Sequence, residues 1–259
     1  MSIFSNDDQF KRLRVWNLCA GGLHLIQGIL MLILSTDFTL PVTTAFVRYD
    51  LAAQRLLPFI NESFSVPIGP LVAGFLFLSA LAHLIISLPG VFAWYTNNLK
   101  KGMNIARWVE YSFSSSLMMV VVVMLVGMYD GVSLLLVFFL NAMMILFGWM
   151  MELHNQTTER TNWTSYWFGV IAGAIPWVAT ALYLFGSGTD GSKPPTFVYW
   201  IFFSIFLFFN VFAINMVLQY KKIGRWKDYL YGERTYIILS LVAKSLLAWQ
   251  VWAGTLRPV

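Results

Sequence analysis

Two charged residues, Glu110 and Lys244, lie within long apolar stretches of the chain. A charge at the centre of a bilayer costs on the order of 2.5–3.5 kcal/mol, so such residues normally face the interior of a helix bundle and form pairs. At a helical rise of about 1.5 Å per residue, Glu110 lies about 12 Å into the membrane when counted from Gly102, and Lys244 lies about 16 Å into it when counted from Glu233. The two depths agree within one helical turn, so we expect an ion pair between the two side chains.

Two kinds of chemistry fit this pair. One is a structural ion pair that fixes the register of two helices. The other is covalent, because a lysine in an apolar pocket has its ammonium form disfavoured and its neutral amine condenses with an aldehyde to a Schiff base. Once protonated, that Schiff base needs a nearby carboxylate. A mid-membrane lysine on the last of seven helices, with an acid on the third, is typical of a retinal protein.

The composition predicts a membrane protein. Hydrophobic residues make up 58% of the 259 residues and charged residues 11%, with a mean hydropathy of +0.68. Soluble domains carry about 25% charged residues, so the composition argues against a soluble enzyme, a disordered protein and a nucleic-acid-binding protein. The net charge of +5 is better explained by charges flanking a membrane. The single cysteine, Cys19, excludes an internal disulfide and a cysteine-built zinc site, and we expect no metal.

Seven stretches contain the roughly 20 mostly apolar residues that a transmembrane helix needs. They are Val15–Leu34, Val66–Trp94, Val109–Met128, Val132–Met151, Trp167–Phe185, Phe197–Leu218 and Thr235–Trp252. We therefore expect an all-α membrane protein, a single seven-helix transmembrane domain over residues 1–259. Apart from Glu110, no acid is expected within a span.

The loop charges predict the orientation. Twelve of the 17 Lys and Arg residues fall on the side of the N-terminus and four on the other side. The positive-inside rule then places the N-terminus in the cytoplasm and the C-terminus outside the cell. The long connection over residues 35–65 would lie outside. A structured loop is expected there, and a β-hairpin is one form that its β-branched residues allow.

Four runs of residues resemble the heliorhodopsin family, and the resemblance extends from about Trp16 to the C-terminus. The runs are Arg107–Ser116, Asn141–Trp149, Trp167–Trp177 and Tyr236–Trp249. The resemblance implies seven helices with a cytoplasmic N-terminus, and a homodimer. It also implies all-trans retinal bound covalently to Lys244, with Glu110 as its counterion. Ser240, one turn before Lys244 on the same helix face, would lie beside the Schiff base.

Two histidines, His24 and His83, match those that the family places in a polar cavity on the cytoplasmic side of the Schiff base. The alternative for each is a satisfied core residue. Gln27 lies about one turn after His24, and Ser79 lies about one turn before His83, each on the same helix face as its histidine. We expect Gln27 and Ser79 each to hydrogen-bond a histidine or ordered water. We predict that this group forms the cavity that accepts the Schiff-base proton.

Three aromatic residues, Trp177, Phe209 and Trp249, lie at depths where a polyene would pass. We predict that they form walls of the retinal pocket. The alternative is that they pack in the core or face lipid, as aromatic residues in spans usually do.

The predicted function is light sensing, with reversible loss of the Schiff-base proton and a signalling role, and no enzyme activity. Related proton pumps carry a second carboxylate one turn before the lysine and a proton donor further along the third helix, whereas Ser240 and Val121 occupy these positions. One alternative is a light-driven or light-gated ion (proton) transporter. Another is a light-regulated accessory protein whose basic loop Lys221–Arg234 docks a cytosolic partner, although such a loop also fits lipid headgroups.

The expected location is the cell membrane, with retinal, membrane lipid and an unknown cytoplasmic signalling protein as partners.

Overall fold

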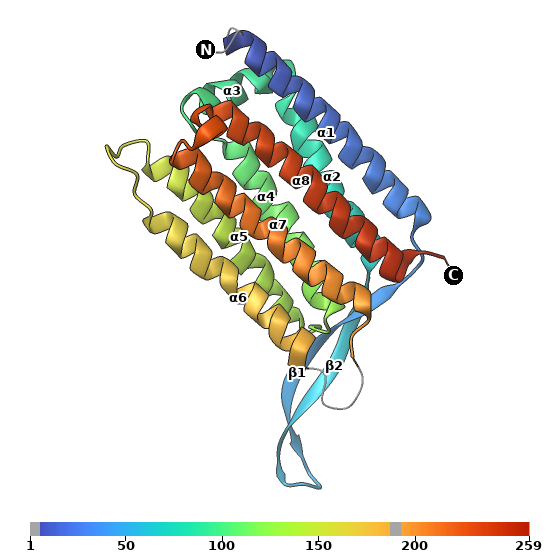
Figure 1. Cartoon of the computed structure of the whole chain (residues 1–259). Coiled ribbons are helices and arrows are strands. Elements are labelled where there is room, and N and C mark those ends of the chain that lie inside the picture. The colour runs from blue at the N-terminus through green and yellow to red at the C-terminus, as the bar shows by residue number, and fades with distance from the viewer. Residues whose placement is uncertain (1–5, 187–192, 259) are drawn as a thin grey trace.

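The computed structural model describes residues 6–186 and 193–258. Its α-helices lie side by side as one bundle (Figure 1). They are α1 (Asn6–Leu34), α2 (Ile68–Ile86), α3 (Pro89–Lys100), α4 (Ile105–Leu125), α5 (Gly131–His154), α6 (Thr164–Gly186), α7 (Thr196–Tyr220) and α8 (Tyr229–Val251). Within the described residues, seven helices, all but α3, are long and apolar enough to cross a membrane. The predicted seven-helix membrane protein is therefore confirmed.

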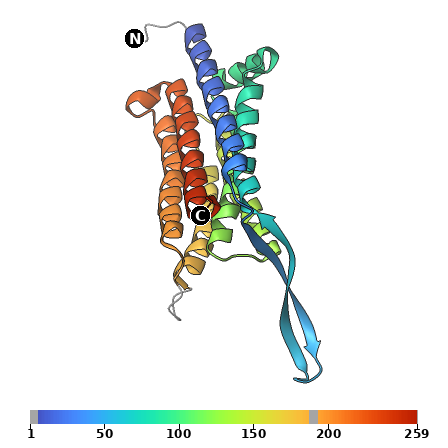
Figure 2. The ribbon, with the colours of Figure 1, turned by 90° about the vertical axis from the view of Figure 1, so that its right-hand side faces the viewer.

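The connection between α1 and α2 is a β-hairpin, which confirms the structured loop expected there. Strands β1 (Thr39–Asp50) and β2 (Arg55–Pro67) pair antiparallel along their whole length. The hairpin projects well beyond the helices (Figure 2). At its base, the amide of Thr43 donates to the carbonyl of Tyr129 in the α4–α5 turn, at 2.8 Å. We call the end of the bundle that carries the hairpin the hairpin end. The end at which α1 begins is called the opposite end.

The second predicted span, Val66–Trp94, is wrong at its C-terminal side. The helix ends at Ile86, and Pro89 starts the separate short helix α3. Proline lacks an amide hydrogen and pushes the preceding residue out of the helical region, and Leu88 accordingly has an extended backbone, with ψ 144°. Helix α3 lies at the opposite end of the bundle (Figure 1), where Tyr95 and Leu99 pack into a small apolar cluster.

Helix α4 runs through the interior of the bundle and packs against α2, α5, α6 and α7. Its start is fixed by Asn104, whose side-chain oxygen accepts from the amide of Arg107 at 3.0 Å and caps the helix. Its second half is apolar and buried, with Met119 and Val121 among the residues of the main core. The interior is therefore apolar toward the hairpin end, and the polar residues of α4 lie in its first half.

Candidate functional site

The predicted ion pair is present in the structure. The ammonium of Lys244 on α8 donates to Oε1 of Glu110 on α4 at 2.8 Å, and the two side chains are 3% and 7% exposed. The same ammonium donates to the hydroxyl of Ser240 at 3.0 Å. Ser240 precedes Lys244 by one turn, so the helix presents both side chains on one face. A buried amine is thus held between a carboxylate and a hydroxyl.

Ser79 of α2 also contacts this pair. Its hydroxyl donates to Oε1 of Glu110 at 2.6 Å, the same oxygen that receives the Lys244 bond. The sequence predicted Ser79 beside His83, but the structure places its hydroxyl on Glu110. Three helices, α2, α4 and α8, therefore meet at one carboxylate.

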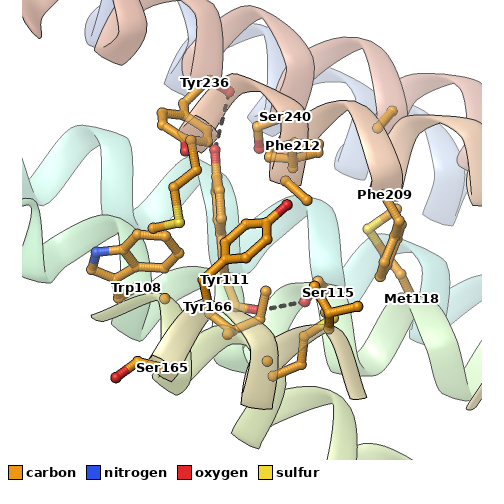
Figure 3. Close-up of a pocket in the computed structure, with 18 of the residues that line it drawn as sticks. Trp108, Tyr111, Ser115, Met118, Ser165, Tyr166, Phe209, Phe212, Tyr236 and Ser240 are labelled. Carbon is orange, nitrogen blue, oxygen red and sulfur yellow. Dashed lines mark hydrogen bonds between the residues drawn. The ribbon is translucent and has the colours of Figure 1, made fainter. Parts of the chain in front are cut away.

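An apolar cavity of about 140 Å³ has Lys244 in its lining. Figure 3 shows this cavity, with Tyr111 and Phe209 among the side chains around it. Its walls come from α4, α5, α6, α7 and α8 and are mostly aromatic and aliphatic. Prominent among them are Trp108, Tyr111, Met118, Tyr166, Phe209, Phe212 and Tyr236, and Ser240 and Lys244 complete one wall. An apolar chamber with a single primary amine in its wall matches the chemistry of retinal, which is an aldehyde on a long apolar chain. The residues present therefore fit this cofactor.

Glycines give this cavity part of its width. Gly148 of α5 and Gly169 of α6 both line it. A Cβ atom at Gly148 would lie 2.6 Å from Cη2 of Trp108, and one at Gly169 would lie 3.3 Å from Cβ of Phe147. Side chains at these positions would displace neighbouring groups, Trp108 among them.

The three predicted pocket aromatics lie in different surroundings. Phe209 lines the apolar cavity. Trp177 packs edge-on against Phe209, with ring centroids 5.4 Å apart, and is not among the lining residues. The indole of Trp249 donates to Oε1 of Gln27 at 3.1 Å, away from the cavity lining. Sequence reasoning missed Trp108, Tyr111, Phe212 and Tyr236, because these residues lie on three helices, α4, α7 and α8, that converge only in the folded bundle.

A second cavity, of about 30 Å³, lies on the other side of the ion pair and is more polar. It has room for about two water molecules. Its polar lining residues are Asn17, His83, Tyr95, Asn104, Arg107, Glu110, Tyr111, Glu233 and Tyr236. Burial raises the pKa of the Tyr95 hydroxyl well above its usual range, so this group stays neutral.

Two tyrosines separate the cavities. Tyr111 and Tyr236 line both chambers, and the Tyr111 hydroxyl donates to the carbonyl of Tyr236 at 3.0 Å. Lys244 lines the apolar chamber and Glu110 lines the polar one. The ion pair therefore joins a chamber suited to a polyene with a chamber suited to water and protons.

The two histidines come together beside the polar cavity. The rings of His24 and His83 stack with centroids 5.9 Å apart. Nδ1 of His83 lies 2.7 Å from Oδ1 of Asn17. His24 is fully buried, and neither of its ring nitrogens has a hydrogen-bond partner among the described residues. Gln27 does not join them, because its amide donates to the carbonyl of Leu23.

A buried group of charges at the opposite end of the bundle contradicts one sequence expectation. Arg107 on α4 pairs with Glu152 on α5 and Glu233 on α8, and all three side chains are at most 3% exposed. The expectation that Glu110 is the only acid within a span is thus wrong. All three residues stand near the ends of apolar stretches, where hydropathy alone does not distinguish a buried charge from a loop charge. A usable signal was the placement of Arg107 three residues before Glu110, on nearly the same helix face.

Comparison with known proteins gives one informative result. Comparison with curated proteins gives no match. The family model described as heliorhodopsin matches residues 13–256, nearly the whole chain. The paired buried lysine and glutamate and the adjoining apolar chamber lie within this match. The chain therefore belongs to the heliorhodopsin family of retinal-binding microbial rhodopsins.

Proposed function

We propose that this protein is a light sensor that holds all-trans retinal covalently at Lys244, with Glu110 as the counterion. The observation that carries the proposal is the position of Lys244, whose buried amine lines the apolar chamber while it pairs with Glu110. Bound retinal would supply a light-driven change of shape. The aromatic walls, Phe209 and Phe212 among them, would orient it, and Ser240 would hold the amine in place.

The proton at Nζ of Lys244 would move into the polar cavity and return from it. Glu110 and His83 line that cavity, and His24 stacks behind His83. Histidine titrates near neutrality and can hold a transient proton. Toward the hairpin end, the buried side chains of α4 include Val121 and Val123, which cannot carry a proton. A proton that leaves and returns on one side produces a signal without net transport.

The remaining parts of the proposal concern orientation and partners. The loop charges support a cytoplasmic N-terminus, which would place the polar cavity on the cytoplasmic side and the hairpin outside. The α7–α8 connection then faces the cytoplasm, with Lys221, Lys222, Arg225 and Lys227 exposed. This basic loop is the proposed contact for a signalling partner. The homodimer remains a prediction from the family resemblance.

A photocurrent recording combined with flash spectroscopy tests the sensor proposal. Cells that express the protein with retinal should show a transient near-ultraviolet species, which marks loss of the proton from Nζ of Lys244, and no sustained current under continuous light. The Lys244→Ala variant is the control and should show neither signal. A sustained current in either direction would contradict the sensor and favour the ion transporter.

A further inference from the structure

The group formed by Arg107, Glu152 and Glu233 is the largest set of buried charges that the site described above leaves without a role. Two carboxylates share one guanidinium. Arg107 donates through Nη2 to Oε1 of Glu152 at 2.5 Å and through Nη1 to Oε1 of Glu233. We call these three residues the anionic cluster.

The hydrogen bonds indicate that both carboxylates are ionised. Oε2 of Glu152 accepts from the indole of Trp108 at 2.6 Å and from the amide of Asn104 at 2.8 Å, and Oε2 of Glu233 accepts from the side-chain amide of Asn104 at 2.6 Å. All four carboxylate oxygens therefore receive bonds from N–H groups, which favour the charged form. With one guanidinium against two carboxylates, the cluster carries one negative charge that nothing within it balances.

This negative charge lies at the polar cavity. Arg107 and Glu233 line the cavity together with Glu110 and His83. Among the described lining residues, Arg107, Glu110 and Glu233 are the only ones with formal charges when His83 is neutral. Glu110 is balanced by Lys244, so the cluster supplies the excess charge of the cavity wall.

We propose that the anionic cluster retains the mobile proton in the polar cavity and so sets how long it stays away from Nζ of Lys244. This inference rests on the proposed function, in which that proton enters the cavity. A proton that leaves Nζ carries one positive charge into a chamber whose wall holds the net negative charge of the cluster. The attraction stabilises the separated state and delays the return of the proton. The cluster acts through charge: its members are neither among the hydrogen-bond partners of the Lys244 amine nor among the lining residues of the apolar chamber, so they are positioning residues.

The test compares flash-induced lifetimes of the near-ultraviolet species in the full-length, retinal-loaded protein. Glu152→Gln and Glu233→Gln each make the cluster neutral. Each should shorten the lifetime about tenfold, the effect of one unit charge at about 10 Å in a medium with an effective dielectric constant of about 20. Glu159→Gln, which removes an exposed carboxylate from the α5–α6 connection, is the matched control and should leave the lifetime unchanged.

A double variant separates charge from packing. Arg107→Gln combined with Glu152→Gln loses the ion pair and its hydrogen bonds but keeps one net negative charge on Glu233. We expect a lifetime within about twofold of the unsubstituted protein. A double variant that shortens the lifetime as much as Glu152→Gln does would overturn the proposal, because packing would then explain both results.

Failure of the proposed function looks different, because the unsubstituted protein would then show no near-ultraviolet species at all.

Discussion

The carboxylate of Glu110 is the residue on which the site depends. Its Oε1 atom accepts one hydrogen bond from Lys244 and one from Ser79, so a single oxygen joins α8 and α2 to α4. The depth estimate from the sequence predicted the pair with Lys244. It did not predict the bond from Ser79. The spacing of Ser79 and His83 along α2 shows that they share a helix face, but it gives no information about which residue of α4 lies opposite.

Replacing Glu110 by Gln should change the colour of the pigment. The substitution removes the charge and keeps the shape, so the positive charge at Nζ of Lys244 loses its balancing partner. We expect a red-shifted visible band or a near-ultraviolet band at neutral pH, recorded by absorption spectroscopy. A spectrum that is unchanged between pH 5 and 9 would argue against Glu110 as the counterion.

Replacing Ser79 by Ala should make Glu110 easier to protonate. The lost hydrogen bond to a charged group is worth about 1.5–3 kcal/mol. The acid-induced red shift that marks neutralisation of Glu110 should therefore occur at a pH higher by roughly one unit or more. Ser116→Ala is the matched control, because Ser116 is a buried serine of α4 that bonds to Ser112 and Asn141. If both variants titrate like the unsubstituted protein, Ser79 does not support the counterion.

At the scale of the elements, apolar runs predicted where helices cross the membrane but not where they end. Pro89 ends the second span earlier than hydropathy alone indicates, because the flanking residues of α3 are also apolar. Arg107, Glu152 and Glu233 extend three spans at the opposite end of the bundle. A charge near a helix end is compatible with solvent or with burial, and only the packing of α4, α5 and α8 decides between them.

The close approach of α4 and α5 shapes the apolar cavity, and Gly148 permits it. Gly148→Val should push the Trp108 ring, which a Cβ atom alone would already contact at 2.6 Å. We expect slower uptake of all-trans retinal and a lower pigment yield, measured as visible absorbance after addition of retinal. Gly22→Val is the control, because a Cβ atom at Gly22 on α1 meets nothing within 4 Å. Equal uptake in both variants would show that Trp108 does not limit the cavity.

At the scale of the whole molecule, seven membrane-spanning helices and a structured loop between the first two follow from the sequence, whereas the two cavities do not. The walls of each chamber come from helices far apart in the chain, and their separation by Tyr111 and Tyr236 depends on how α4 and α8 pack. Periodicity and hydropathy describe each helix alone. The arrangement that divides an apolar chamber from a polar one is therefore visible only in three dimensions.

A labelling experiment tests which side of the membrane the hairpin faces. In a Cys19→Ser background, we expect Ala52→Cys, at the exposed tip of the hairpin, to react with a membrane-impermeant maleimide added to intact cells. Glu159→Cys, in the connection between α5 and α6, should react only after the cells are opened. The reverse pattern would place the hairpin in the cytoplasm and invert the proposed direction of proton movement.

Attachment of retinal to Lys244 is the central claim, and a reconstitution spectrum tests it most directly. All-trans retinal is added to the purified protein, to Lys244→Ala and to Lys222→Ala, which removes an exposed lysine of the α7–α8 connection. We predict a visible band in the unsubstituted protein and in Lys222→Ala, and none in Lys244→Ala, because only Lys244 places an amine in the wall of the apolar chamber. A visible pigment that survives in Lys244→Ala would contradict the account.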